Sequence, residues 1–445
     1  MRRLPELLPS CLVLACVAAL AGCGGDAPQS AAQALATQAP APQAPVAAST
    51  SSTTPSAPAA AVPVEAKSAA HSNLPAWSAA LYDAAIGAAA RMPLDPHIKN
   101  RSKVQEELAS GLLQLGEIDR ARAVAQSIAN WRKGCVLADC AYECVVQGRD
   151  ADADALLAQA IKVLGQQSDE EVQVWQKARI RAKIARAMLR QGKFEAADSY
   201  LVDLEPAEAK LIADERARTA PLEDFEGQVG SLEPALSGTN FDVIKAAMET
   251  ATLVYEKWYE RREERERVEA LLRANWDKLP RDLRLAAILR MSESALRRGD
   301  KAVSSKLLDE TRLLVSALRW QPEHKLPIEA KIAELLYKGG EVDRAAQVVA
   351  EALAYYDAER AKIVNIERAG ALRPMAEALA RTDRKPEALV LYKRVVEEGM
   401  ENPNSRPRLD DLAATVVSMV ANGLEPDATL AARLAEIGAK LDHPW

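Results

Sequence analysis

From Pro75 to the end of the chain, apolar residues recur at three- and four-residue spacing, with charged residues between them. This is the period of amphipathic α-helices, in which one face is buried and the other is solvated. Helix-breaking residues occur singly between these stretches, which is typical of short links between consecutive helices. The pattern therefore predicts an all-α domain over residues 75–445.

A repeat of small residues runs through this domain. Each copy has a turn residue, a small residue seven positions before it and another five positions after it, except that the last copy has Val416 at the first of these positions. The turn residues are Gly116, Gly148, Gly192, Gly299, Gly340, Asp383 and Gly423. Glycine at a helix end can adopt the left-handed conformation that a Cβ disfavours, and small residues let two helices approach closely. Each copy is therefore expected to be one tandem helix–turn–helix pair.

The copy around Gly148 matches a known pattern best, with Ala141 before the turn and Ala153, Leu157 and Ala160 after it. It resembles the tetratricopeptide (TPR) repeat family, and the resemblance covers about residues 100–445. The family implies a superhelical solenoid with a concave groove. Most turns here lie 40 to 44 residues apart, whereas the family's repeat is about 34 residues long. The proline expected at the end of each repeat is mostly missing.

The interval between Gly192 and Gly299 contains no clear copy, and an irregular insert is expected at about residues 205–280. Within it, residues 220–239 are predicted to form a loop and residues 242–279 a charged helical stretch. One degenerate or inserted helix pair is a further possibility for this interval. Charges of both signs between Tyr255 and Arg267 favour a solvated helix with salt bridges. The alternative is a docking face that uses Trp258 and Tyr259.

The first residues predict an export signal. Arg2 and Arg3 precede a short apolar run, which ends in the sequence Leu-Ala-Gly before Cys23. This resembles a bacterial lipobox, which implies a signal peptide over residues 1–22 and lipidation of Cys23. Acyl chains would then anchor the chain to a membrane without a spanning helix. The alternatives are an ordinary signal peptide with an incidental thiol, or the poorer match at Cys16.

Residues 23–74 are rich in Ala, Pro, Ser and Thr and have almost nothing to bury, so they are expected to form a disordered tether. The residue after Cys23 is Gly24 rather than aspartate. By the sorting rule familiar from enteric bacteria, this favours the outer membrane, with the protein facing the periplasm.

Composition and the absence of known motifs exclude several classes of partner, fold and activity. The net charge of −6 disfavours nucleic acid as a partner, and 4% aromatic residues disfavour a β-sandwich or barrel. The sequence has no HExxH, EF-hand, glycine-rich phosphate loop or nucleophile elbow. Neither an enzyme nor a cofactor is therefore expected.

Cys135, Cys140 and Cys144 are interpreted as buried small hydrophobic residues. A disulfide that involves Cys135 and a metal site are the alternatives, although no histidine lies nearby to complete a ligand set.

The resemblance implies that the first helix of each pair lines the groove. The residues expected to face it are Tyr142, Arg179, Arg186, Arg190, Arg297, Arg373 and Arg381. Arginine suits bidentate capture of carboxylates, so the groove is predicted to bind an acidic or C-terminal peptide segment. The alternative is that these are ordinary solvated arginines, and Pro374 could shift the register beside Arg373.

Solenoids expose long surfaces that suit protein partners, so the leading hypothesis is a non-catalytic adaptor in the cell envelope. Its partners would be other envelope proteins or their peptide segments, and the membrane itself through the lipid. The alternative is a lipoprotein that captures a small ligand or glycan in the same groove.

Overall fold

The computed structural model describes residues 74–166, 173–317 and 319–445. These residues form helices and no strands, which confirms the predicted all-α architecture of tandem helix pairs. The predicted signal peptide, Cys23 and nearly all of the tether lie outside the described residues.

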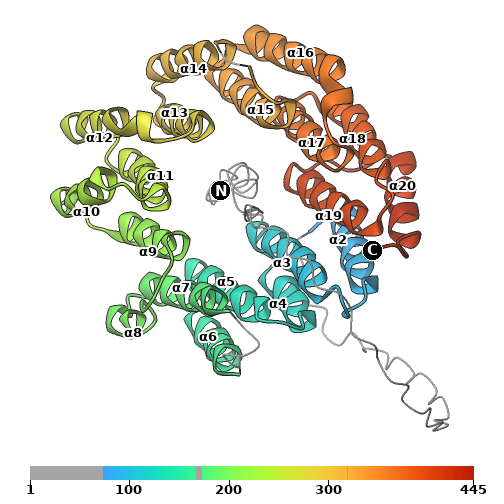
Figure 1. The fold of residues 1–445 in the computed structure, drawn as a ribbon, viewed down its shortest axis with the longest axis horizontal. Coiled ribbons are helices and arrows are strands. Elements are labelled where there is room, and N and C mark those ends of the chain that lie inside the picture. The colour runs from blue at the N-terminus through green and yellow to red at the C-terminus, as the bar shows by residue number, and fades with distance from the viewer. Residues whose placement is uncertain (1–73, 167–172, 318) are drawn as a thin grey trace, which may run out of the picture.

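The helices form two layers around a common centre (Figure 1). The inner layer contains α3 (Ile98–Gln114), α5 (Arg132–Val146), α7 (Val174–Arg190), α9 (Pro206–Thr219), α11 (Phe241–Lys257), α13 (Arg281–Arg297), α15 (Pro322–Gly339), α17 (Asn365–Arg381) and α19 (Ser405–Ala421). The outer layer contains α2 (Ala76–Arg91), α4 (Ile118–Ser127), α6 (Asp150–Gly165), α8 (Phe194–Asp198), α10 (Phe225–Ser237), α12 (Arg262–Asn275), α14 (Lys301–Ser316), α16 (Val342–Glu359), α18 (Lys385–Met400) and α20 (Ala428–Ala439). Each inner helix packs against the next inner helix along the chain.

All of the predicted turn residues adopt the left-handed conformation. The six glycines have φ between +58° and +93°, and Asp383 has φ of 58°. The residue after each turn donates its N–H to a carbonyl five positions earlier, as Glu117 does to Leu112 (2.9 Å) and Arg149 to Cys144 (2.8 Å). This bond closes the end of the first helix in each pair, so the helix–turn–helix prediction is confirmed.

The small residues of the repeat lie where the helices of a pair cross. Ala141 and Ala153, on opposite sides of Gly148, are both fully buried. In the copy around Gly299 the two positions are serines, and the hydroxyls of Ser292 and Ser304 lie 2.8 Å apart and share a hydrogen bond. Ala428 departs from the pattern because it is exposed.

The two ends of the array meet, a feature that the repeat does not predict. Helices α2 and α3 pack against α19, and α2 also packs against α20, so the array closes into a ring (Figure 1). At this seam Arg91 donates hydrogen bonds to the carbonyls of Gly438 and Ala439, both at 2.8 Å. A solenoid normally needs special repeats to cover its apolar end faces. Here the two end faces cover each other.

Carboxyl groups lie together in the seam, with Glu107 on α3 and Asp410 and Asp411 on α19. Burial raises the pKa of Glu107 to about 7, and the two aspartates add to the rise while Arg373 and Lys103 oppose it. Burial also raises the pKa of Asp411 to about 6. The folded chain therefore binds protons here that the unfolded chain would release.

This predicts a pH dependence of the seam. A raised carboxyl pKa means that the contribution of Glu107 to stability increases as the pH falls from about 7 to about 4.5. Glu107→Gln is expected to stabilise the fold at pH 8 by about 1 kcal/mol, since the side chain is partly accessible to solvent. Urea unfolding at pH 5 and pH 8 measures this. If the free energy of unfolding changes between pH 5 and pH 8 by the same amount in the variant as in the wild type, the prediction is wrong.

The stretch in which the repeat could not be followed continues the ring as α9 to α12. The loop predicted for residues 220–239 is wrong, because most of this segment is helix α10. Phe225, Val229, Leu232 and Leu236 are buried along one side of α10. Burial of this apolar face outweighs the glycines and the internal Pro234 that suggested a loop, since helices in proteins owe most of their stability to packing.

The charged stretch after α10 is two helices rather than one. Helix α11 ends at Lys257 and α12 begins at Arg262, followed by the 3-10 turn Trp276–Lys278. The docking alternative for Trp258 and Tyr259 is wrong, because both side chains are buried. The Trp258 indole N–H donates to the Leu222 carbonyl (2.9 Å). The solvated-helix interpretation holds for α12, in which most residues are accessible to solvent.

Candidate binding surfaces

The inner helices carry all of the residues that the sequence predicted to face a groove. Tyr142 lies on α5. The predicted arginines between positions 179 and 190 lie on α7, and the others lie on α13 and α17. Pro374 leaves α17 continuous, so Arg373 keeps its place in the inner layer.

Each of these arginines is paired within the chain, mostly with a carboxylate on a neighbouring inner helix. The pairs are Arg179–Glu106 (3.7 Å), Arg186–Glu215 (3.7 Å), Arg190–Glu215 (3.5 Å), Arg297–Glu256 (2.7 Å), Arg373–Asp411 (3.1 Å) and Arg381–Glu334 (3.1 Å). An acidic peptide would therefore have to compete with these internal carboxylates. That these arginines bind such a peptide stays a prediction.

Glu215 on α9 is the most enclosed of the carboxylates, with 0% of its side chain exposed. The Tyr142 hydroxyl donates to it at 2.9 Å, and the Arg186 guanidinium lies over the Tyr142 ring at 3.7 Å from the ring centre. Burial raises the pKa of Tyr142, and the Glu215 carboxylate adds to the rise. This cluster joins α5, α7 and α9. Its charged groups are paired with one another, which is typical of a cluster that stabilises the fold.

A second cluster surrounds Glu334 on α15. Its carboxylate lies 3.6 Å from the Lys331 ammonium and 3.1 Å from the Arg381 guanidinium, and it also accepts a bond from Lys338. Burial alone would raise the pKa of Glu334, but these cations outweigh it and hold the pKa at about 2. Lys331 also bonds Glu293 on α13 at 3.0 Å.

The sequence analysis missed these acidic partners, although a signal for them exists. Glu293, Glu334 and Glu377 each stand six positions before a turn residue, and Arg297 and Arg381 stand two positions before one. An alignment of the copies by their turns places acids and bases in separate columns of the inner layer. Neighbouring helices then bring the two columns together.

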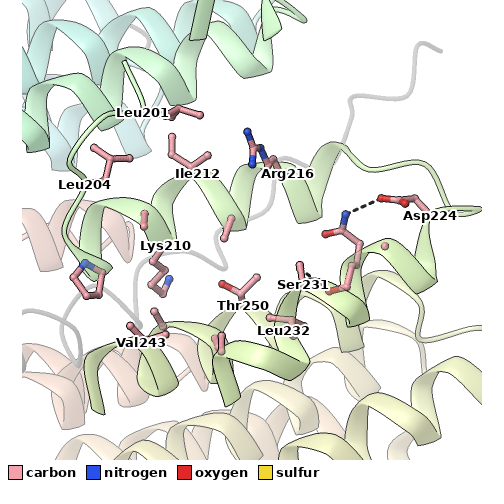
Figure 2. Close-up of a pocket in the computed structure, with 18 residues that line it drawn as sticks. Leu201, Leu204, Lys210, Ile212, Arg216, Asp224, Ser231, Leu232, Val243 and Thr250 are labelled. Carbon is pink, nitrogen blue, oxygen red and sulfur yellow. Dashed lines mark hydrogen bonds between the residues drawn. The ribbon is translucent and has the colours of Figure 1, made fainter. Parts of the chain in front are cut away.

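A cavity of about 670 Å³ lies among α9, α10 and α11 (Figure 2). It exists because α10 packs on α11 and α12 and scarcely touches α9, the inner helix before it in the chain. The lining residues are Leu201, Leu204, Pro206, Ala209, Lys210, Ile212, Ala213, Arg216, Asp224, Gly227, Gln228, Ser231, Leu232, Ala235, Val243, Ala246, Ala247 and Thr250. A volume of this size is typical of binding sites.

The lining is mainly aliphatic, and its polar groups differ in how well they are paired. Lys210 bonds Asp214 at 2.6 Å and pairs with Glu249 at 3.3 Å, and Gln228 donates to Asp224 at 2.8 Å. Arg216 pairs only loosely, because Asp198 lies 3.7 Å away and both side chains are more than half exposed. Of the two cations that line the cavity, Arg216 is therefore the one better able to pair with an anionic ligand.

The three cysteines of the helical domain lie on α5 and are buried and free. Burial raises the pKa of Cys135 to about 12, so the thiol stays protonated. Their burial agrees with the interpretation as core residues.

The residues that the structure describes contain no cluster of three or more His, Cys, Asp and Glu side chains that could hold a metal ion. Within the same ranges, no helix combines the length and apolar character needed to cross a membrane.

No family model matches the sequence, and no curated protein matches it. One similar solved structure is a circular tandem repeat protein with a novel repeat topology and enhanced subunit contact surfaces. It is 14% identical, the alignment covers 82% of this chain and 95% of that chain, and the TM-score is 0.24. The ring described above therefore rests on the contacts within this chain.

Proposed function

We propose that the chain is a non-catalytic scaffold that binds a segment of another protein. The fold of tandem helix pairs is compatible with a protein-interaction role. The observation that carries the proposal is the aliphatic cavity between α9 and α10, at a place where one outer helix leaves the inner layer. The paired arginines join neighbouring inner helices and do not line this cavity.

We also propose that the scaffold works in a bacterial envelope, anchored through acylated Cys23 at the outer membrane and facing the periplasm. The sequence before Gly24 supports this address, and residues 23–74 would let the ring stand clear of the lipid. Anchoring raises the local concentration of a binding module near other envelope proteins.

The anchor is tested by metabolic labelling with an alkyne analogue of palmitate. Cys23→Ser is expected to abolish labelling and to move the chain from the membrane fraction to the soluble fraction. Cys16→Ser is the matched control and is expected to retain both. Labelling that survives Cys23→Ser and disappears in Cys16→Ser would move the anchor to the other thiol.

The scaffold role is tested by crosslinking in intact cells, followed by affinity purification of the tagged chain. A defined set of envelope proteins, absent from an untagged control, is the expected result. If the tagged chain captures nothing specific, the scaffold proposal fails.

Capture of a small ligand is the second candidate, and the volume of the cavity favours it. None of the described lining residues is aromatic, so a glycan would find no ring to stack on. An aliphatic compound released on denaturation of the purified chain, identified by mass spectrometry, would support this candidate.

A further inference from the structure

Beside the cavity, the outer helix α10 does not pack on the inner helix before it as other outer helices do. In the pairs α5/α6, α13/α14, α15/α16 and α17/α18, the outer helix packs firmly on the inner helix before it. Helix α10 instead turns away from α9, and the space between them is open down to α11 (Figure 2). The cavity therefore lies where the architecture elsewhere places a contact between two helices.

The two walls are suited to a helix. Ala209 and Ala213 are four residues apart on α9, and Gly227, Ser231 and Ala235 are spaced by four on α10. Small residues at this spacing form a continuous shallow groove along a helix, which lets another helix approach closely. Since α9 has 14 residues and α10 has 13, each wall is long enough for about three helical turns.

The backbone of the walls also selects a helix over an extended segment. The amides and carbonyls in the middle of α9 and α11 are bonded within their own helices. The same holds for α10 except at Pro234, which has no N–H to donate to the Gly230 carbonyl. An extended peptide would bring unpaired backbone groups into an aliphatic cavity, at a cost of about 1–3 kcal/mol for each. A helix satisfies its own backbone before it binds.

The charge at the rim of the cavity favours an occupant that carries an acidic residue. Figure 2 shows Leu201 and Ile212 on one side of the space with Arg216 beside them, and Ser231 and Leu232 across from it. Arg216 is 55% exposed and only loosely paired, so it is free to meet a carboxylate at the rim. An acidic residue next to an aliphatic face complements this arrangement.

We propose that the cavity between α9 and α10 binds an amphipathic α-helix of a partner protein. The partner helix is about three turns long, its aliphatic face lies on α9, α10 and α11, and an acidic residue pairs with Arg216. This proposal deepens the proposed scaffold function and rests on it.

The probe is a fluorescent peptide with the sequence of the chain's own α6, Asp150–Gly165. This helix has Asp150 and Asp152 in its first turn and buries Leu156 and Leu157 on one side. Its binding to the full-length chain is measured by fluorescence anisotropy. A control peptide with Leu156 and Leu157 both changed to Asp keeps the length and loses the aliphatic face.

Ala213→Trp fills the cavity, and Ala213 is solvent-exposed, so the ring is expected to tolerate the change. Binding of the peptide is expected to weaken at least about tenfold, and Arg216→Glu is expected to weaken it about fivefold. Arg262→Glu is the matched control for charge, because Arg262 is 81% exposed on α12 and lies outside the cavity. Circular dichroism confirms the fold of each variant, and Ser231→Trp replaces Ala213→Trp if the latter does not fold.

Equal binding to the wild type and to the cavity-filled variant overturns the proposal, as does no binding at about 1 mM peptide. An aliphatic small molecule released from the purified chain, without peptide binding, also overturns it and assigns the cavity to a small ligand. If crosslinking captures the same envelope proteins with Ala213→Trp as with the wild type, the helix site fails while the scaffold stands. If the wild type captures nothing, the scaffold fails, and the peptide titration still decides what the cavity binds.

Discussion

Gly111→Leu is expected to open the seam of the ring and to lower the free energy of unfolding by about 3 kcal/mol. Gly111 lies on α3, and a Cβ at this position would approach the Tyr82 hydroxyl of α2 to 2.5 Å and two methyl groups of Val417 on α19 to 2.9 and 3.0 Å. Tyr82 is fully buried, so it has little room to move. A larger side chain would push α3 away from both neighbours.

Two measurements separate an open ring from a loosened one. Urea unfolding gives the loss of stability, and small-angle X-ray scattering gives the radius of gyration, which rises if the ends separate. Gly87→Leu on α2 makes the same chemical change at a position where nothing lies within 4 Å of the added Cβ. A similar loss in both variants would show that the seam is not special.

Glu215→Ala is expected to cost about 3–5 kcal/mol, the other large effect in this chain. The substitution leaves the Tyr142 hydroxyl of α5 and the Arg186 guanidinium of α7 without the α9 carboxylate that they contact. Removal of one partner from a buried charged cluster is more destabilising than the loss of a surface pair. Thermal and urea unfolding both report the change.

Glu256→Ala is the matched control for this prediction. Glu256 also pairs with an inner-layer arginine, Arg297 at 2.7 Å, but about a third of each side chain is exposed. Solvent screens such a pair, so the expected cost is below about 1 kcal/mol. Comparable losses at Glu215 and Glu256 would mean that burial does not decide the strength of these pairs.

The local parts of the fold could be predicted from the sequence. The turn at Gly148 and its equivalents depend on a left-handed residue and on nearby hydrogen bonds, and both leave a mark at fixed spacing. Helix α10 could not be predicted, because Phe225 and Leu236 make it helical by packing on elements that follow later in the chain. Its glycines and Pro234 gave the opposite local signal.

For the candidate binding surfaces, too, the sequence predicted local positions but not contacts between distant residues. The position of Arg381 on an inner helix followed from the repeat, whereas its partner Glu334 lies 47 residues earlier on another helix. The seam joins Arg91 to Gly438, which lie 347 residues apart. The cavity depends on the direction in which α10 leaves α9, and no periodicity of the sequence records that direction.

Closure of the ring also limits how this architecture can change during evolution. An open solenoid can gain or lose one unit at little cost, because each unit contacts only its neighbours. Deletion of a helix pair here would rotate α2 away from α20 by one step and break the bonds of Arg91. The copy number of pairs is therefore fixed by geometry. Insertions and deletions are expected in links and outer helices instead, where α8 already shows how short an outer helix can become.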